Sequence, residues 1–520
     1  MKQKIIELKV EPPYGYNTEL LKELLLSRKI LPHKETPFAI LSRSIDARKK
    51  VVLINLKILI GELPTPFFFP VEYQDVSKAE PLLIIGAGPA GLFGALRAIE
   101  LGFKPIILER GCDVRKRRRD LAAINKFHLV NPESNYCFGE GGAGTYSDGK
   151  LYTRSNKRGN IRKILEIMVQ HGANPDILID KHPHIGTNKL PILIQNIRNT
   201  ILNYGGEIHF ETKVIDFIIE KNKLIGVLTE KNKAFYGFAT ILATGHSSRD
   251  IFTLLQQKNI LIEAKPFALG VRVEHPQELI DKIQYHCLQR NPYLPAARYE
   301  LITHTKIKGK VRSIYSFCMC PGGFIVPAAT QPGEVVVNGM SPSKRNSIFA
   351  NSGIVVSIEP DDWKSYTNHK QLAAMVFQAE IETKACQMAG NTQKAPAQRL
   401  VDFVEQTYSS SLNPTSYQPG LESVMMNELL PQFITESLRN AFIDFGKKMK
   451  GFLTNEAQII GVESRTSSPV RIPRNPETGE HVTLQNLFPC GEGAGYAGGI
   501  MSAAIDGQKC VELAICKKWN

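Results

Sequence analysis

The hydrophobic pattern at the start of the chain predicts a small module with the element order β, α, β, β. Residues 5–10 read as a short strand, and Asn17-Thr18 precede LLKELLL, whose apolar residues have helical spacing. PFAILSRS and KVVLINLKILIGE predict two strands joined by the polar link IDARKK. A Pro-rich stretch follows, so we expect the module and its linker to span residues 1–76.

After the linker, the pattern becomes that of an α/β domain. PLLIIGAGPAGLFGALRAIELGFKPIILERG predicts a strand, a glycine turn, a helix and a second strand. FATILATGH adds a strand, and NLFPCGEGAGYAGGIMSAAIDG returns to strand, glycine loop and helix. The middle of the chain mixes strand-like pieces, such as FALGVRVEH, with helical ones, such as HKQLAAMVFQAEIETKACQMAG. We therefore expect one domain from residues 77–250 plus 461–520, with an α+β domain inserted at 251–460.

Composition and charge narrow the class of protein. The 520 residues are 43% hydrophobic and 22% charged, which is typical of a globular protein and excludes a collagen or a disordered chain. A net charge of +14 favours anionic ligands, acidic surfaces or nucleic acid without choosing among them. Nine cysteines without regular spacing indicate a reducing compartment. With no signal peptide and no apolar run of about 18 residues, we expect a cytoplasmic protein without a membrane span.

A GxGxxG motif, Gly86, Gly88 and Gly91, lies where the first strand of the α/β domain meets its helix. The first glycine allows a tight turn, the second lets the backbone approach a pyrophosphate, and the third permits close helix–strand packing. Free N–H groups and the positive end of the helix dipole attract the phosphates. The alternative is a structural glycine turn, but both flanking strands are present, so we predict a dinucleotide-binding loop that includes Pro89 and Ala90.

An acidic residue in register with this loop narrows the choice of dinucleotide. Glu109 ends the second strand, where a carboxylate accepts hydrogen bonds from an adenosine ribose, and Arg110 follows it. This favours FAD or NAD over a cofactor with a 2′-phosphate. Two later segments point to FAD: one strand ends in Ala243, Thr244 and Gly245, and the last strand ends in Gly491 and Glu492 before a helix that begins near Gly498, Gly499 and Ile500.

Together these segments resemble those of the glutathione-reductase-like FAD flavoproteins. That resemblance implies a C-terminal segment that closes the flavin site, with Glu492 at a position where the family usually has Asp bonded to the ribityl chain. The helix near Gly498 would place its positive end where a reduced flavin carries negative charge. The alternative is a glycine-rich helix start that only packs against the sheet.

A closer resemblance covers nearly the whole chain. The segments SIDARKK, FGEGGAGTYSDGKLYTR, CMCPGGFIV, NGMSPSKRNSIFANSGIVV and GVESRTSSPVRI are similar to those of a bacterial family of FAD-dependent dehydrogenases. The family implies the fold and the cofactor but no established substrate. In related flavoproteins a loop such as the second segment lies along the pyrophosphate and the flavin edge, which implies contacts from Gly141, Gly142, Gly144 and Thr145; the alternative is a flexible surface loop.

Four residues are candidates for catalysis. Cys318 and Cys320 could exchange electrons with a flavin or act as a nucleophile or acid, but we favour two small apolar side chains in a core. Arg465, with two nearby arginines, could bind an anionic substrate or be a solvated loop charge. His246 follows the Ala-Thr-Gly turn and could touch the flavin or substrate, although a structural histidine is the more common case.

A basic run is interpreted as structural, and a metal site is not expected. The basic run VRKRRRD, residues 114–120, could contact nucleic acid, but it lacks interleaved aromatic residues, and we favour a solvated basic helix that helps to neutralise the pyrophosphate. No zinc-type spacing of Cys or His is present, so we predict no metal.

We expect an α/β fold: a three-layer, Rossmann-like FAD-binding domain, an inserted α+β substrate domain and an N-terminal ferredoxin-like βαββ module. The expected function is an oxidoreductase in which non-covalent FAD exchanges hydride at N5 with a small molecule. We find no second βαβ unit with a GxGxxG fingerprint, so a dedicated NAD(P)H domain is not expected, and NADH or NADPH would act only as a transient reductant. Two alternatives remain: a flavin-dependent RNA-modifying enzyme, although we do not expect a nucleic-acid partner, and an FAD-binding scaffold without turnover. Oligomeric state is left open.

Overall fold

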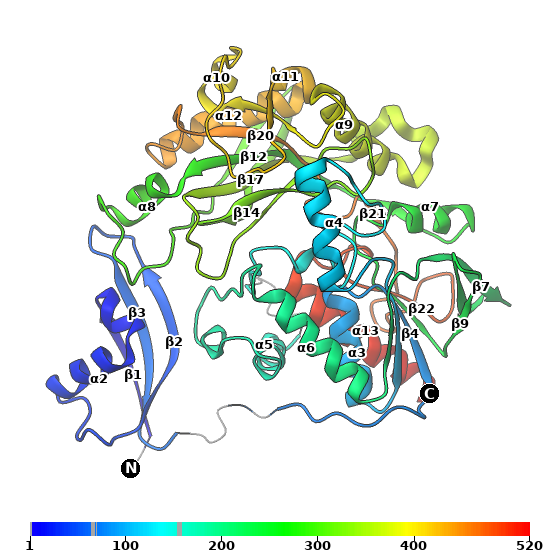
Figure 1. The fold of residues 1–520 in the computed structure, drawn as a ribbon, viewed down its shortest axis with the longest axis horizontal. Coiled ribbons are helices and arrows are strands. Elements are labelled where there is room, and N and C mark those ends of the chain that lie inside the picture. The colour runs from blue at the N-terminus through cyan, green and yellow to red at the C-terminus, as the bar shows by residue number, and fades with distance from the viewer. Residues whose placement is uncertain (1–2, 64–67, 69, 153–158, 520) are drawn as a thin grey trace.

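The architecture is a computed structural model that describes residues 3–63, 68, 70–152 and 159–519 (Figure 1). Its centre is a five-stranded sheet in which all neighbouring strands are parallel, as the βαβ pattern predicts. Most of the linker residues 64–69, and Thr153 and Arg154 of one family motif, lie outside the described residues. In sheet order the strands are β22 (Leu487–Pro489), β10 (Thr240–Leu242), β4 (Pro81–Ile85), β5 (Lys104–Leu108) and β6 (Glu207–His209).

Alternate residues of β4 face two different apolar cores, which makes this unit three layers deep. Leu82 and Ile84 pack with helices on one face, whereas Leu83 and Ile85 pack with an antiparallel meander and α7 on the other. Figure 1 shows the helices and the meander on opposite sides of the sheet. The helices are α3 (Pro89–Glu100), α5 (Ile161–Gln170), α6 (Leu190–Asn203) and α13 (Ile500–Trp519); the second face has β7 (Val214–Glu220), β8 (Lys223–Thr229), β9 (Ala234–Tyr236) and α7 (Arg249–Gln257).

Above this unit lies a seven-stranded sheet, and we call the part built on it, residues 267–463, the cap. Strand β20 crosses the predicted boundary at residue 461 and pairs with β12 and β18 inside the cap. In sheet order the strands are β13 (Ile302–Ile307), β14 (Lys310–Cys320), β17 (Phe349–Ile358), β12 (Phe267–Pro276), β20 (Gln458–Glu463), β18 (Ala395–Arg399) and β19 (Leu421–Ser423).

Helices and short ribbons complete the cap and its surroundings. Helix α12 lies along the sheet, and its buried side chains, among them Phe442 and Phe445, join the apolar core of the cap. The remaining elements are α4 (Val114–Phe127), α8 (Gln277–Tyr285), α9 (Ala373–Met388), α10 (Leu400–Glu405), α11 (Met426–Leu429), α12 (Gln432–Lys448), β11 (Glu263–Ala264), β15 (Phe324–Pro327), β16 (Val337–Met340), β21 (Val470–Arg471) and the 3₁₀ helices at Gly142–Gly144, Pro175–Leu178 and Pro360–Leu372. No helix of the described residues has both the length and the apolarity that crossing a bilayer requires.

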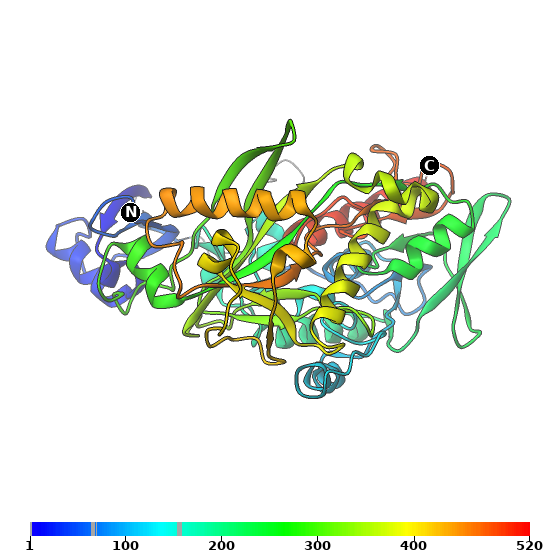
Figure 2. The same cartoon turned by 90° about the horizontal axis from the view of Figure 1, so that it is seen from above.

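The N-terminal module has the order β1, α1, α2, β2, β3, so the short helix α1 precedes the one helix that the pattern predicts; its sheet has the order β1-β3-β2 with both pairs antiparallel. The side chain of Asn17 accepts hydrogen bonds from the N–H groups of Glu19 and Leu20, which confirms the predicted cap. The module lies at the end of the molecule away from the C-terminus (Figure 2). Its elements are β1 (Lys4–Val10), α1 (Pro12–Tyr16), α2 (Thr18–Ser27), β2 (Phe38–Asp46) and β3 (Leu53–Ile60).

One buried arginine fastens this module to the parallel-sheet unit. Arg43 donates through Nε to Asp180 at 2.7 Å and through Nη2 to Asp176 at 3.3 Å, and its guanidinium lies 4.4 Å from the centre of the Tyr16 ring. Its backbone also exchanges hydrogen bonds with Ile179 and Lys181. The buried side chains of the module are continuous with the core of the cap.

We expect Arg43→Ala to destabilise the protein by about 1–2 kcal/mol, because it leaves two carboxylates without their cation while both remain partly in water. Thermal unfolding of the variant measures this. Arg48→Ala is the matched control, since Arg48 pairs with Asp46 but is largely exposed, and it should unfold like the wild type. Equal losses in the two variants would contradict a docking role for Arg43.

Candidate active site

The predicted dinucleotide loop has the geometry that its glycines require. Gly86 has φ +103°, and a Cβ there would lie 2.6 Å from the carbonyl oxygen of Ala243. Gly88 caps α3, and Pro89 occupies the first turn of that helix. A Cβ at Gly91 would lie 1.9 Å from the carbonyl oxygen of Gly86, so this glycine is required for packing of the helix on the strand.

Glu109 binds the backbone of three neighbouring turns. Its Oε2 accepts from the N–H of Ala87 at 2.8 Å, and its Oε1 accepts from the N–H groups of Gly111 and Gly139, each at 2.9 Å. Arg110 beside it donates to Glu133 at 2.7 Å and to Asp250 at 2.9 Å. The predicted ribose acceptor therefore also organises the loops at this edge of the sheet.

Arg117, within the basic run, is the residue that sequence reasoning placed wrongly. Four residues of that run, Arg115, Lys116, Arg118 and Arg119, are exposed as expected, but Arg117 is fully buried. Its guanidinium donates to the carbonyl oxygens of Asn135, Tyr136, Glu140 and Gly142 at 2.7–2.9 Å. Burial lowers its pKa.

The consequence is that a buried cation shapes the glycine loop of residues 139–145. Gly142 comes so close to the dinucleotide loop that a Cβ there would lie 3.2 Å from Cα of Gly88. Thr145 donates to the carbonyl oxygen of Glu140 at 2.8 Å and packs inside the loop. No sequence signal distinguishes Arg117 from its basic neighbours except its place on the apolar face of α4, with Val114, Leu121 and Ile124.

The C-terminal segment meets the strand end that carries the Ala-Thr-Gly turn. Nδ1 of His246 lies 3.1 Å from Oε2 of Glu492. Burial would raise the pKa of Glu492, but the hydrogen bond and charge of His246 outweigh it, so the pKa lies below the usual range. Helix α13 begins at Ile500, directly after Gly498 and Gly499, as predicted.

These loops surround one cavity of about 540 Å³. It is bounded by the ends of β4, β5, β10 and β22, by the start of α13 and by the cap. Three of the predicted contacts, Gly91, Gly141 and Thr145, do not line it. The predicted residues that do are Gly86, Gly88, Pro89, Ala90, Glu109, Arg110, Gly142, Gly144, Ala243, Thr244, Gly245, His246, Cys318, Cys320, Arg465, Gly491, Glu492, Gly498, Gly499 and Ile500.

Several lining glycines are not required by the protein's own packing. A Cβ at Gly88, Gly245, Gly498 or Gly499 would meet no protein atom within 4 Å. Gly88 also has φ −75°, which any residue adopts. The space in front of these glycines therefore belongs to the cavity, and their lack of a side chain suits a ligand that touches the backbone.

Cys318 and Cys320 form part of the cap wall. Strand β14 has a register shift between Phe317 and Cys320, and Cys318 has φ +43°, which exposes its side chain to the cavity. Removal from bulk water raises the pKa of Cys318 to about 11, although the Lys150 ammonium opposes this. Burial also raises the pKa of Cys320. Both thiols stay protonated near neutral pH, which disfavours a thiolate nucleophile.

Arg465 is committed to a buried ion-pair network rather than to solvent. It donates to Glu334 at 2.7 Å, to Glu382 at 2.9 Å and to Thr330 at 2.6 Å. Arg249, at the start of α7, donates to the same two carboxylates. Burial alone would lower the pKa of Arg465, but the two carboxylates outweigh it and hold the pKa above its usual value. This network joins the loop after β10 to the cap.

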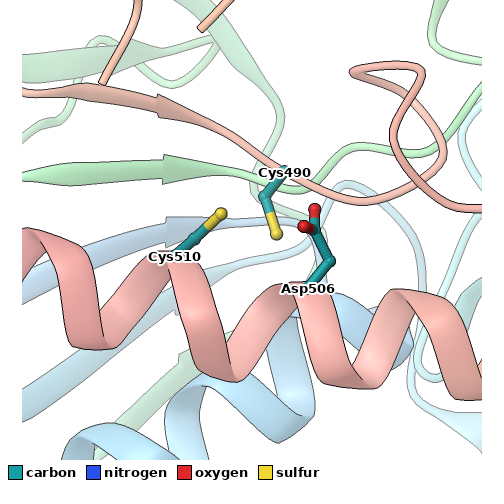
Figure 3. A group of neighbouring side chains, drawn as sticks. All are labelled: Cys490, Asp506 and Cys510. Atoms are coloured by element: carbon teal, nitrogen blue, oxygen red, sulfur yellow. The ribbon is translucent and has the colours of Figure 1, made fainter. Parts of the chain in front are cut away.

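Figure 3 shows a buried group, Cys490, Asp506 and Cys510, whose possible ligand atoms lie within 4.8 Å of one another. The guanidinium of Arg474 already binds this group of side chains. Arg474 donates to Asp506 at 2.6 and 3.0 Å and lies 3.0 Å from Sγ of Cys510. The hydrogen bond between the thiols, and then burial, raise the pKa of Cys490. Asp506 also accepts from the N–H of Gly491, so the group positions the turn before Glu492.

Comparison with known proteins identifies the family. The model of the family described as "FAD-dependent protein, C-terminal domain-like" matches residues 266–466, and a domain of unknown function matches residues 1–61. An uncharacterized protein of Clostridium beijerinckii is 39% identical over 520 residues, which cover 96% of this chain and 95% of that protein. The chain belongs to the same family as this uncharacterized protein, and within it residues 266–466 match the FAD-dependent domain model.

More distant likenesses of the chain are partial or weak. The tRNA uridine 5-carboxymethylaminomethyl modification enzyme MnmG of Alkaliphilus metalliredigens is 28% identical over 172 residues, 32% of this chain and 24% of that enzyme. The crystal structure of CtdE in complex with FAD has a TM-score of 0.33 at 10% identity and covers 84% of each chain. Glycine oxidase from Bacillus cereus has a TM-score of 0.30 at 14% identity, covering 84% of this chain and 95% of that one.

Two glycines of the dinucleotide loop have different expected roles: Gly88 contacts the ligand, and Gly91 allows the helix to pack on the strand. We expect Gly88→Ala to weaken FAD binding by roughly 10-fold or more while destabilising the cofactor-free protein by less than about 1 kcal/mol, because the new methyl group enters only the cavity and Ala is a poorer helix N-cap than Gly. Gly91→Ala should instead destabilise the cofactor-free protein by about 1–3 kcal/mol through its clash with Gly86. Fluorescence titration with FAD and thermal unfolding measure the two effects. Unchanged FAD affinity in Gly88→Ala would contradict the assignment of the cavity.

Proposed function

We propose that the protein is an oxidoreductase that binds FAD non-covalently in the cavity and exchanges a hydride with a small molecule. The observation that carries this is the convergence of the predicted cofactor segments on one cavity whose glycines leave room for a ligand. Bound FAD would accept or donate the hydride at its N5 atom. The match of residues 266–466 to the model of an FAD-dependent protein family supports the choice of cofactor.

Different groups of lining residues suit different parts of FAD. Glu109, with Arg110 and Lys213 nearby, would hold the adenosine end. The first turn of α3, with its unpaired N–H groups, and the glycine loop of residues 142–144 would hold the pyrophosphate. The N-terminus of α13 would face the flavin, where its positive dipole end stabilises negative charge. The cap closes the other side and limits access of water.

The four candidates for catalysis take different places in this proposal. Cys318 faces the cavity as a neutral thiol and is suited to donate a proton or a hydrogen bond. His246 would act with Glu492 beside the cofactor, since the two side chains are in contact. Arg465 would position the cap, because its guanidinium is already bound to two carboxylates. Cys320 is buried and would act only as a neighbour of Cys318.

The deciding experiment is the absorption spectrum of the purified protein, followed by anaerobic titration with NADH and then NADPH. We expect a flavin spectrum that one of the nucleotides, as a transient reductant, bleaches. A flavin that only dithionite reduces would direct the search to substrates that themselves reduce FAD. A flavin that no reductant bleaches would favour a scaffold, and absence of flavin after reconstitution would contradict the proposal.

A second candidate function is modification of RNA by the bound flavin. Two observations favour it: the partial similarity to a tRNA-modifying enzyme and four exposed cations on α4, Arg115, Lys116, Arg118 and Arg119. Such a surface would bind phosphates without reading the sequence.

If RNA is the substrate, a tRNA mixture should bind at low salt, with affinity that falls steeply as salt rises. Release of four phosphate contacts gives a slope of about −3 in log K against log salt. Fluorescence anisotropy measures this, and neutralising Arg115 and Arg119 together should flatten the slope. Absence of binding at low salt would rule out this second function.

A further inference from the structure

The cations that line the cavity differ in whether they have a counter-charge. Four are present: Arg110, Lys150, Lys213 and Arg465. Arg110 and Lys213 share one pair of carboxylates, and Arg465 binds two others. Among the residues that the structure describes, no carboxylate forms an ion pair with Lys150. This ammonium is therefore the cavity cation without an ion pair in the described part of the chain, although it lies close enough to the Asp148–Arg345 pair to help lower the pKa of Asp148.

The lining carboxylates are all engaged elsewhere. Asp148 forms a buried pair with Arg345, and Glu300 lies 3.5 Å from Arg298 at the exposed end of the lining. The other three, Glu109, Asp250 and Glu492, bind the backbone, Arg110 and His246 respectively. A rearrangement that brought one of them to Lys150 would break an existing interaction.

Lys150 is held in place by the cap. It follows Gly149, whose φ is +68°, and its Nζ donates to the carbonyl oxygen of Met319, between Cys318 and Cys320. One carbonyl satisfies one of the three N–H donors of an ammonium. The two thiols stay protonated and bring no negative charge. A half-buried ammonium with spare donors, whose neighbouring carboxylate Asp148 is already paired with Arg345, is stabilised by binding an anion.

A second donor lines the same wall. Asn338, on β16, accepts with Oδ1 from the N–H of Gly339 at 2.7 Å. Its amide nitrogen donates to no residue within the described part of the chain. Asn338, in the cap, and Lys150, bound to the cap through the Met319 carbonyl oxygen, thus both supply hydrogen-bond donors to the lining of this cavity.

We propose that Lys150, with Asn338, binds the carboxylate of the substrate, which makes the substrate class a small organic acid. This inference rests on the proposed function, because it places the acid in the cavity next to FAD. Lys150 is then a specificity-determining residue. A reduced flavin is another source of negative charge in this cavity, so the experiment must separate the two.

The test uses the FAD-loaded protein and two simple carboxylates, benzoate and succinate, as probes. We expect at least one of them to perturb the flavin absorption spectrum and to give a Kd that Lys150→Met raises roughly 10- to 100-fold, the usual effect of losing a charge-assisted hydrogen bond. Lys150→Arg keeps the charge and should retain most of the affinity. Asn338→Ala should weaken binding by a smaller factor.

Controls separate a local effect from a general one. Lys364→Met removes the same charge from the exposed 3₁₀ helix Pro360–Leu372, outside the cavity lining, and should leave carboxylate affinity unchanged. The FAD content of each variant reports whether it folds. Calorimetric titration of the cofactor-free protein measures carboxylate binding without flavin, so failure to bind FAD would contradict only the proposed function.

Three results would overturn the proposal. One is equal affinity for the carboxylates in the wild type and Lys150→Met. Another is no binding of either acid, by spectrum or calorimetry, at high millimolar concentration. The third is a lower flavin midpoint potential in Lys150→Met with unchanged carboxylate affinity, which would assign the ammonium to the reduced flavin instead of the substrate.

Discussion

The parallel order of the central sheet is the constraint on which the rest of the site depends. Parallel strands end at a common edge, so the turns after β4, β5, β10 and β22 meet although they lie far apart in the sequence. Each turn contributes what its residues allow: glycines that expose backbone, a carboxylate at Glu109, and the starts of α3 and α13, where the first N–H groups lack a backbone acceptor within the helix. The cavity follows from the topology.

Holding several loops at one edge needs groups that bind backbone oxygens, and buried cations supply them. Arg117 binds four carbonyl groups around the glycine loop, and Arg474 joins Asp506 to the strand before Glu492. Burying such charges is costly unless every donor is satisfied. Arg465 meets this condition with two carboxylates and a hydroxyl, which ties the cap to the loop after β10.

Local patterns were enough to predict the elements, the glycine loop and the helix cap at Asn17, because each depends on neighbours in the sequence. The partners of Arg117 and Arg465 could not be predicted, since they come from residues 18 to 135 positions away. The same reason explains β20: its apolar residues indicate a strand, but only the tertiary structure decides that it pairs with β12 and β18. The cofactor contacts remain predictions, which the cavity supports.

In the described part of the chain, three of the four cations that line the cavity form ion pairs, and Lys150 is the exception. Arg110, Lys213 and Arg465 are neutralised within the chain, so their charges serve structure before they serve a ligand. Lys150 is held by a carbonyl oxygen, which fixes its position without cancelling its charge. A cavity that neutralises three of its cations and leaves the fourth charged selects for an anion at that point, and it selects by electrostatics before any shape is considered.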